Sequence, residues 1–430
     1  MYYSETRRYL RDYNPKQTTV MAITGTKGKT SVSSLASHVL RPSYEHLLLL
    51  NTVGVYWDEE KLFSHQDSVD NFGKAITVMP GRYFYGVFRD QDVDPQQVAA
   101  VMETALGTGV YGTGLTHHSI GVLTNIFQDH IDGEIIRSRD DIYQLKSFIF
   151  KEIRPGGLFV TNADQDLCLR AIQEAQTLNS DLIIKAFTRQ GKDHAKLMAK
   201  RYSLADVYYF EDKVIHSLNE GQLYDISTFP YFFEAMGAHF IAENIMAVMA
   251  ALSVVIPLDR IAKRLNNFRF PFEYGRLQFY HSQEKRLVVD FAHEIESLTQ
   301  MIDLIKNQFK AKPAVVTRIA PDRSDDFIQA FAQDLAKLDI QALYVFDIID
   351  GKKRKIFRSR TGQIRQPGDT VELIASTLAQ SNPSFPVYQF IDEARALDAA
   401  LDREKLILHI KKDLSKIAAL AKQHNLERYL

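Results

Sequence analysis

The sequence predicts an α/β protein of two domains, and two observations carry this prediction. Short apolar runs rich in β-branched residues alternate with helix-like segments through most of the chain, as in parallel sheets covered by helices. The alternation stops at RFPFEYGR, where proline and glycine suit a hinge, and then starts again. We therefore expect a larger parallel-sheet domain over residues 1–270, with a small β-rich insertion at about 181–230, and a smaller Rossmann-like domain over residues 271–430.

The elements of both domains follow in order along the chain. In the larger domain TVMAI, VAAVM, SIGVLTNI and GLFVTN are predicted as strands, and SVSSLASHVL and LCLRAIQEAQ as helices. DVYYFEDKVIHSL and QLYDIST, joined by the polar turn NEGQ, predict a hairpin insertion. Residues 245–256 are apolar but fewer than the ~20 that a membrane-spanning helix needs, so they are expected to form a core helix. The smaller domain repeats the rhythm with strands RLVVDFA, PAVVTRI and ALYVFDI and helices SLTQMIDLIKNQF and FIQAFAQDLAKL.

Charge and cysteine content exclude several classes of function. The 430 residues include 52 Lys and Arg against 53 Asp and Glu, so the net charge of -1 gives no field that attracts nucleic acid or an anionic membrane. A single cysteine, Cys168, can form neither an internal disulfide nor a cysteine zinc cluster. The N-terminal residues MYYSETRRYLRD lack the apolar core of a signal peptide, so we expect a cytoplasmic protein.

The most specific local pattern is the loop between the first strand and the first helix, whose residues are Gly25, Thr26, Lys27, Gly28, Lys29 and Thr30. Glycines let backbone N–H groups surround a phosphate chain, and the following helix adds a favourable dipole. The strict P-loop pattern would place glycine at Ile23, so this loop is a shortened form. It predicts ATP binding, with Lys29 on the terminal phosphates and Thr30 on Mg²⁺, against the alternative of an ordinary turn between strand and helix.

Two further polar residues are expected at the same edge of the sheet. Glu103 follows the strand VAAVM and His130 follows SIGVLTNI, and open α/β sheets bind ligands at the C-terminal ends of their strands. A carboxylate is the usual hard donor for magnesium and an imidazole a less usual one, so the pair predicts a second metal site beside the ATP phosphates. The alternative for both residues is an ordinary surface position near a strand end.

Taken together, the motifs resemble the Mur ligase superfamily, and within it most the C-terminal ligase half of the cyanophycin synthetases. The blocks that carry the resemblance occur in the family's order over nearly the whole chain; they are GTKGKT, LLNTVGVYWDEE, FRDQDVDPQQVAAVMETALGTG, GVLTNIFQDHIDG, DDIYQLKSFIFKEIRPGGLFVTNAD, FIAENIMAVMAA, YGRLQF, VVDFAH and PDRSDDFIQAF. The resemblance implies a P-loop central ATPase domain and an ATP-dependent amide ligase. Such enzymes phosphorylate a substrate carboxylate and let an amino-acid amine attack the acyl phosphate, releasing ADP and phosphate.

The resemblance also implies roles for individual residues. Lys29 would contact the β- and γ-phosphates, and Thr30 would bind the first magnesium. Glu103 would help to hold the metals, and His130 would bind the second. The implied nucleotide contacts elsewhere are Asn244 on the adenine side and, from the second domain, Arg276, Asp290 and His293. Lys146 matches a lysine that many members carbamylate in support of the second magnesium; its modification here is a hypothesis, and a surface lysine on a helix is the alternative.

Three functions stay open. The first is a stand-alone ligase that joins an amino acid to a peptide or small carboxylate acceptor; without an ATP-grasp half before the P-loop, we do not expect it to make cyanophycin from aspartate and arginine unaided. The second is a folylpolyglutamate-synthetase-like glutamate ligase, although NTVGVYWDEE stands where that family has Ser-Pro-His-Leu. The third is a nucleotide-binding scaffold without turnover. Neither nucleic acid nor membrane is an expected partner, and homo-oligomerisation is left open.

Overall fold

The computed structural model describes residues 18–64, 75–91, 93–127, 136–230, 238–269, 278–290, 292, 295–319, 324–347, 357–358, 364–410 and 415–429. The chain divides into two compact units. One comprises Met1–Phe232 with Gly237–Arg269, and the other comprises Phe270–Leu430 with Phe233–Met236.

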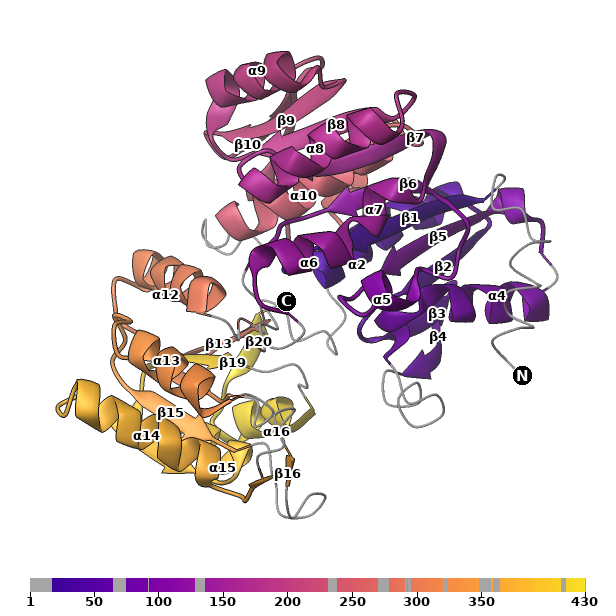
Figure 1. Cartoon of the computed structure of the whole chain (residues 1–430). Coiled ribbons are helices and arrows are strands. Elements are labelled where there is room, and N and C mark those ends of the chain that lie inside the picture. The colour runs from indigo at the N-terminus through magenta and orange to yellow at the C-terminus, as the bar shows by residue number, and fades with distance from the viewer. Residues whose placement is uncertain are drawn as a thin grey trace. The chain divides into compact units, whose positions relative to one another are not determined.

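A sheet of eleven strands, counted over the described residues, forms the first unit in the order β11-β10-β9-β8-β7-β6-β1-β5-β2-β3-β4 (Figure 1). The central strands from β9 to β2 run parallel, and antiparallel strands flank them at both ends. The strands are β1 (Thr19–Thr24), β2 (His46–Leu50), β3 (Gly54–Trp57), β4 (Glu60–Ser64), β5 (Val98–Glu103), β6 (His118–Leu123), β7 (Ile153–Asn162), β8 (Ile183–Thr188), β9 (Asp206–Glu211), β10 (Val214–Ser217) and β11 (Gly221–Asp225).

Helices cover both faces of this sheet. The first and the longest helices of the unit, α2 and α10, pack on one face, and α4, α7, α8 and α9 pack on the other. The helices are α2 (Lys29–Leu40), α4 (Pro80–Gln91), α5 (Thr108–Tyr111), α6 (Arg139–Lys146), α7 (Phe148–Lys151), α8 (Asp166–Leu178), α9 (Gly191–Tyr202), α10 (Ala238–Leu252) and α11 (Leu258–Leu265). Because both faces are covered, β5 and β6 are buried along their whole length, which explains the apolar runs VAAVM and IGVL within them.

The expected insertion at about 181–230 differs from the structure, because this segment belongs to the main sheet. β8 and α9 continue the alternation of strand and helix, and β9 pairs parallel with β8. The expected hairpin through the NEGQ turn is present as β10 and β11, and DVYYFEDKVIHSL itself folds into a second antiparallel pair, β9 and β10, so the hairpin extends to the edge of the same sheet. The helix α9 buries only Ala195, Met198 and Tyr202, so its apolar pattern is too sparse to reveal a helix in the sequence.

The second unit has a seven-stranded sheet, counted over its described residues, in the order β18-β15-β14-β19-β13-β12-β20. The strands from β18 to β13 are parallel, and β12 and β20 are antiparallel, so the predicted Rossmann-like alternation is confirmed. The strands of this sheet are β12 (Gln278–His281), β13 (Arg286–Asp290), β14 (Ala314–Thr317), β15 (Leu343–Phe346), β18 (Val387–Phe390), β19 (Leu406–Ile410) and β20 (Glu427–Tyr429). A separate antiparallel pair is formed by β16 (Phe357–Arg358) and β17 (Ile364–Arg365). The helices are α12 (Ile295–Phe309), α13 (Asp325–Leu335), α14 (Asp369–Ser381), α15 (Glu393–Arg403) and α16 (Ser415–Gln423).

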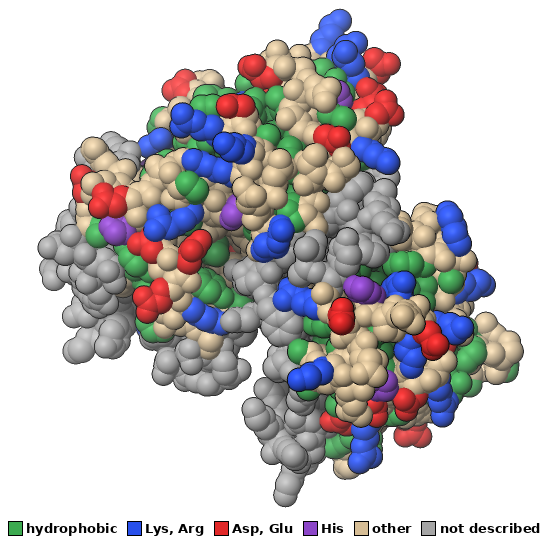
Figure 2. Space-filling model, turned by 180° about the vertical axis from the view of Figure 1, so that it is seen from behind, with side chains coloured by type: hydrophobic (Ala, Val, Ile, Leu, Met, Phe, Trp, Pro, Cys, Tyr) green, Lys and Arg blue, Asp and Glu red, His purple; other side chains and the backbone are tan. Residues whose placement is uncertain are grey.

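The surface carries charges of both signs. On the face shown in Figure 2, Lys and Arg side chains are interspersed with Asp and Glu side chains, in keeping with the balanced composition. In the part of the chain that the structure describes, no helix has the length and apolarity needed to cross a lipid bilayer.

Candidate functional site

Glycines shape the loop between β1 and α2. Gly25 has a φ of +143°, and Gly28, the N-cap of α2, has a φ of +80°. A Cβ atom at Gly25 would lie 1.9 Å from Thr124 Oγ1, and one at Gly28 would lie 2.6 Å from Asn244 Oδ1. The loop therefore requires glycine at both positions, and it leads into the first turn of a helix, where backbone N–H groups favour an anion.

Residues 124–127, which follow β6 and are called the supporting segment below, hold this loop by hydrogen bonds. Thr124 Oγ1 donates to the Lys27 carbonyl at 2.6 Å, and Lys27 N donates to Asn125 Oδ1 at 2.7 Å. Thr26 N donates to the Asn125 carbonyl at 2.9 Å, and Phe127 N donates to Thr26 Oγ1 at 3.0 Å. This supporting segment was not predicted from the sequence. The available signal was the polar pair Thr124 and Asn125, directly after the strand β6, which lies next to β1.

Glu103 lies beside the loop because β5 pairs with β1 and places Glu103 opposite Ile23. Its side chain is buried, and its carboxylate accepts three hydrogen bonds. Thr30 Oγ1 donates to Oε2 at 3.0 Å, while Thr52 donates its backbone N–H to Oε2 at 3.0 Å and its hydroxyl to Oε1 at 2.6 Å. These bonds offset the cost of burying a carboxylate. Thr52 was also missed, although a polar residue just beyond the apolar strand β2 was again the signal.

The oxygen atoms at this point fit a magnesium ion. A carboxylate and the hydroxyls of Thr30 and Thr52 are hard donors, which Mg²⁺ prefers. Within the described residues, no three His, Cys, Asp or Glu side chains gather into a metal-binding group. That is compatible with Mg²⁺, which commonly takes one or two protein carboxylates and completes its shell with phosphate oxygens and water.

Two lysines approach the C-terminal end of β1. Lys29 begins α2, and its Nζ donates to the Thr26 carbonyl at 2.9 Å, so its side chain lies back along the loop. Lys146 ends α6 and is only 4% exposed, with its Nζ 3.5 Å from Thr24 Oγ1. The alternative of a solvated surface lysine at position 146 is therefore wrong.

The remaining predicted residues fall into three groups. Asn244 lies in α10, which packs against α2, and its side-chain oxygen lies close to Gly28. Asp290 is the buried last residue of β13 in the second unit. The other predicted residues lie outside the described residues; these are His130, Arg276 and His293.

Two buried titratable groups near the sheet are structural. Burial lowers the pKa of His118 to about 4, although the bond from its Nε2 to the Ile149 carbonyl, at 2.8 Å, acts in the opposite direction. Burial raises the pKa of the Cys168 thiol to about 12. Because the thiolate is the reactive form of cysteine, Cys168 is no candidate nucleophile.

The chain matches a known family over more than half of its length. A family model described as the Mur ligase middle domain matches residues 23–252. The chain is 26% identical over 419 residues to a cyanophycin synthetase of Synechocystis sp., and the match covers 95% of this chain and 44% of that protein. It spans 42% to 44% of the length of the first three curated cyanophycin synthetases that it matches.

Solved structures share the fold. E. coli FolC in complex with DHPP and ADP superposes with a TM-score of 0.64 at 15% identity, covering 98% of this chain and 91% of that chain. A bifunctional folylpolyglutamate synthase/dihydrofolate synthase with Mn, AMPPNP and L-glutamate bound gives a TM-score of 0.61 at 16% identity, covering 98% of this chain and 92% of that chain.

Proposed function

The chain belongs to the Mur ligase middle-domain family, and on this premise we propose that it is an ATP-dependent carbon–nitrogen ligase. A substrate carboxylate oxygen attacks the γ-phosphorus of ATP, giving an acyl phosphate and ADP. An amino-acid amine then attacks the acyl carbon, phosphate leaves, and an amide forms. Phosphorylation is needed because a free carboxylate has no adequate leaving group for attack by an amine.

The single observation that carries the proposal is the meeting of Glu103 with the hydroxyls of Thr30 and Thr52 beside a glycine-shaped loop. Enzymatic phosphoryl transfer depends mainly on positioning and on neutralising the phosphate charge. The loop backbone and Lys29 would position the phosphates, and Lys29 would neutralise part of their charge. Thr30 and Glu103, with His130, would hold Mg²⁺, which supplies further charge neutralisation between the phosphates.

Lys146 is proposed to act at the same point, at the C-terminal end of β1. Its Nζ is buried against Thr24 Oγ1, the last residue of that strand, so it is not a solvated lysine. Carbamylation would convert this amine into an anionic group suited to a second magnesium, and it stays a hypothesis. Mass spectrometry of the intact active protein at neutral pH tests it, because a carbamylated Lys146 would add the mass of carbon dioxide and acid would remove it.

Recognition of the rest of the nucleotide is proposed for both units. Asn244 would lie on the adenine side of the loop, as the position of its side chain beside Gly28 supports. The residues proposed from the second unit are Arg276, Asp290 and His293. The acceptor carboxylate and the amino acid are proposed only as classes, and a cytoplasmic location stays a prediction.

The proposal is tested by a screen for substrate-dependent ATP turnover. The protein is incubated with ATP, Mg²⁺ and pools of amino acids combined with peptides, folates and small acids, while phosphate, ADP and product mass are followed. We expect one combination to release ADP and phosphate in equal amounts with a new amide. The Lys29→Ala variant should lose ATP binding and turnover together.

Other outcomes identify the alternatives. Turnover with a folate and L-glutamate alone would assign the glutamate-ligase function instead. ATP binding without stimulation by any pool would contradict the ligase proposal and support a nucleotide-binding scaffold.

A further inference from the structure

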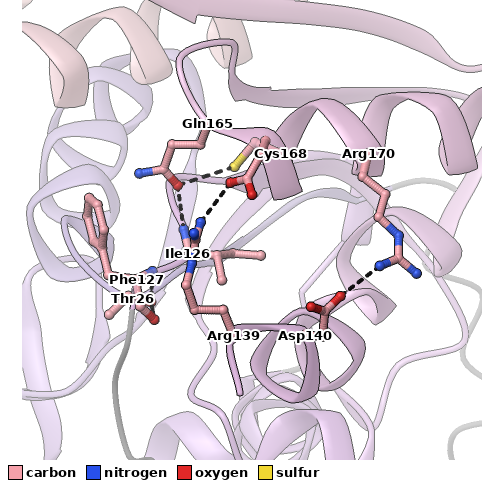
Figure 3. Close-up of polar contacts among 9 residues, drawn as sticks. Thr26, Ile126, Phe127, Arg139, Asp140, Gln165, Cys168 and Arg170 are labelled. Carbon is pink, nitrogen blue, oxygen red and sulfur yellow. Dashed lines mark hydrogen bonds and ion pairs between the residues drawn. The ribbon is translucent and has the colours of Figure 1, made fainter.

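The side chain of Gln165 makes a tertiary hydrogen bond at the start of α8. Gln165 is the N-cap residue of α8, but it makes no side-chain cap bond to that helix. Its Oε1 instead accepts a hydrogen bond from Ile126 N at 2.8 Å, and Cys168 Sγ donates to the same oxygen at 3.8 Å (Figure 3). Glutamine is not among the residues whose side chains commonly cap a helix, and here the carboxamide makes a tertiary contact instead.

The hydrogen bond from Ile126 to Gln165 lies in the middle of the supporting segment, residues 124–127. Asn125 and Phe127, on either side of Ile126, hold Lys27 and Thr26 of the loop. Ile126 is fully buried, so its N–H needs a partner within the protein. A backbone N–H can only donate, so the bond also determines that the oxygen of the Gln165 carboxamide faces the segment. Figure 3 shows Gln165 reaching to this segment from the start of α8.

We propose that Gln165 is a positioning residue for the P-loop. By holding Ile126, it keeps Asn125 and Phe127 in place to bind Lys27 N and Thr26, and thereby keeps the loop in its nucleotide-binding shape. Gln165 acts through these residues and needs no contact with ATP. The inference rests on the proposed function, because it assumes that the loop binds ATP.

The same region supplies a matched control. Two ion pairs join α6 to α8, Arg139 with Asp166 at 2.7 Å and Arg170 with Asp140 at 2.8 Å (Figure 3). The Arg170 and Asp140 side chains are 42% and 65% exposed, and exposed ion pairs contribute little to stability. Asp140→Asn therefore perturbs the same pair of helices, α6 and α8, but leaves the bond between Gln165 and Ile126 in place.

The test uses two variants of Gln165 with opposite consequences. Gln165→Asn shortens the side chain by one methylene and places a favoured N-cap residue before α8, so it should cap its own helix and release Ile126. We expect a melting temperature equal to or slightly below that of the parent, because the new cap offsets at least part of the cost of the unpaired Ile126 N–H. The ATP KM should rise about tenfold, the size expected for a lost buried hydrogen bond, and so should the dissociation constant for a non-hydrolysable ATP analogue. The kcat at saturating ATP should change by less than about twofold, since a loop-positioning effect appears in binding.

Gln165→Glu retains an acceptor oxygen at the same reach and should bind the analogue within about threefold of the parent, as should Asp140→Asn. Parent-like binding by Gln165→Asn would overturn the inference. So would equal weakening in Gln165→Glu and Gln165→Asn, because the acceptor would then not matter. If the parent protein itself fails to bind the analogue, the proposed function fails rather than the role of Gln165.

Discussion

Replacing Gly28 by alanine tests whether the shape of the loop backbone governs nucleotide binding. Gly28 has a φ of +80°, and a left-handed conformation costs an L-residue about 1–2 kcal/mol. The new Cβ would also lie 2.6 Å from Asn244 Oδ1, so the carboxamide must move away. Losing its contacts costs about 1 kcal/mol more. The sum of about 2–3 kcal/mol corresponds to roughly 30- to 150-fold weaker ATP binding if the loop relaxes instead of bearing the strain.

Gly221 provides a control with the same backbone geometry. Its φ is +79°, and a Cβ there would meet no atom within 4 Å. Gly221→Ala should therefore carry the left-handed strain without a clash, at the start of the edge strand β11. Titration calorimetry with a non-hydrolysable ATP analogue, alongside thermal unfolding, separates the two effects. Parent-like ATP affinity in Gly28→Ala, or equal weakening in Gly221→Ala, would refute the reasoning.

Three further predictions concern the groups around the loop. Thr52→Val removes the hydroxyl that donates to the Glu103 carboxylate, and it should lower turnover about 10- to 100-fold and alter the Mg²⁺ dependence. Thr52→Ser keeps the hydroxyl and should resemble the parent. Similar turnover in both variants would argue against a role of the hydroxyl. Lys146→Ala should lower kcat by at least about 100-fold while sparing ATP binding. Lys151→Ala should have little effect, because Lys151 is exposed and its Nζ contacts Ser147 Oγ and the Phe150 ring. Unaltered steady-state kinetics in Lys146→Ala would remove Lys146 from the mechanism. His118 has a pKa of about 4 in the fold against 6.5 for the free side chain, so between these pH values the unfolded chain binds a proton that the folded chain does not. The free energy of unfolding should therefore be highest above pH 6.5 and fall by roughly 3 kcal/mol as the pH drops to about 4. Urea unfolding between pH 7 and 4 should show a smaller loss for His118→Gln, and identical slopes would contradict the buried neutral imidazole.

Local patterns were sufficient for much of the fold and for the centre of the site. The loop from Gly25 to Thr30 could be recognised because strand, glycines, lysine, hydroxyl and helix are consecutive in the chain. Glu103 could be placed near it because parallel strands end at a common edge. The helix α9 and the continuity of the 181–230 segment with the main sheet could not be anticipated, since a polar helix with few buried residues leaves a weak pattern.

By itself, the sequence determined the alternation of strands and helices, the position of the loop and the identity of its charged groups, because these depend on neighbouring residues. Only the tertiary structure decided which distant residues support that loop. Thr52 meets Glu103 across 51 positions, Asn125 meets Lys27 across 98, and Gln165 meets Ile126 across 39. Such partners are determined by strand order and by the packing of helices on the sheet. The sequence around a polar side chain does not show which distant group that side chain will bind.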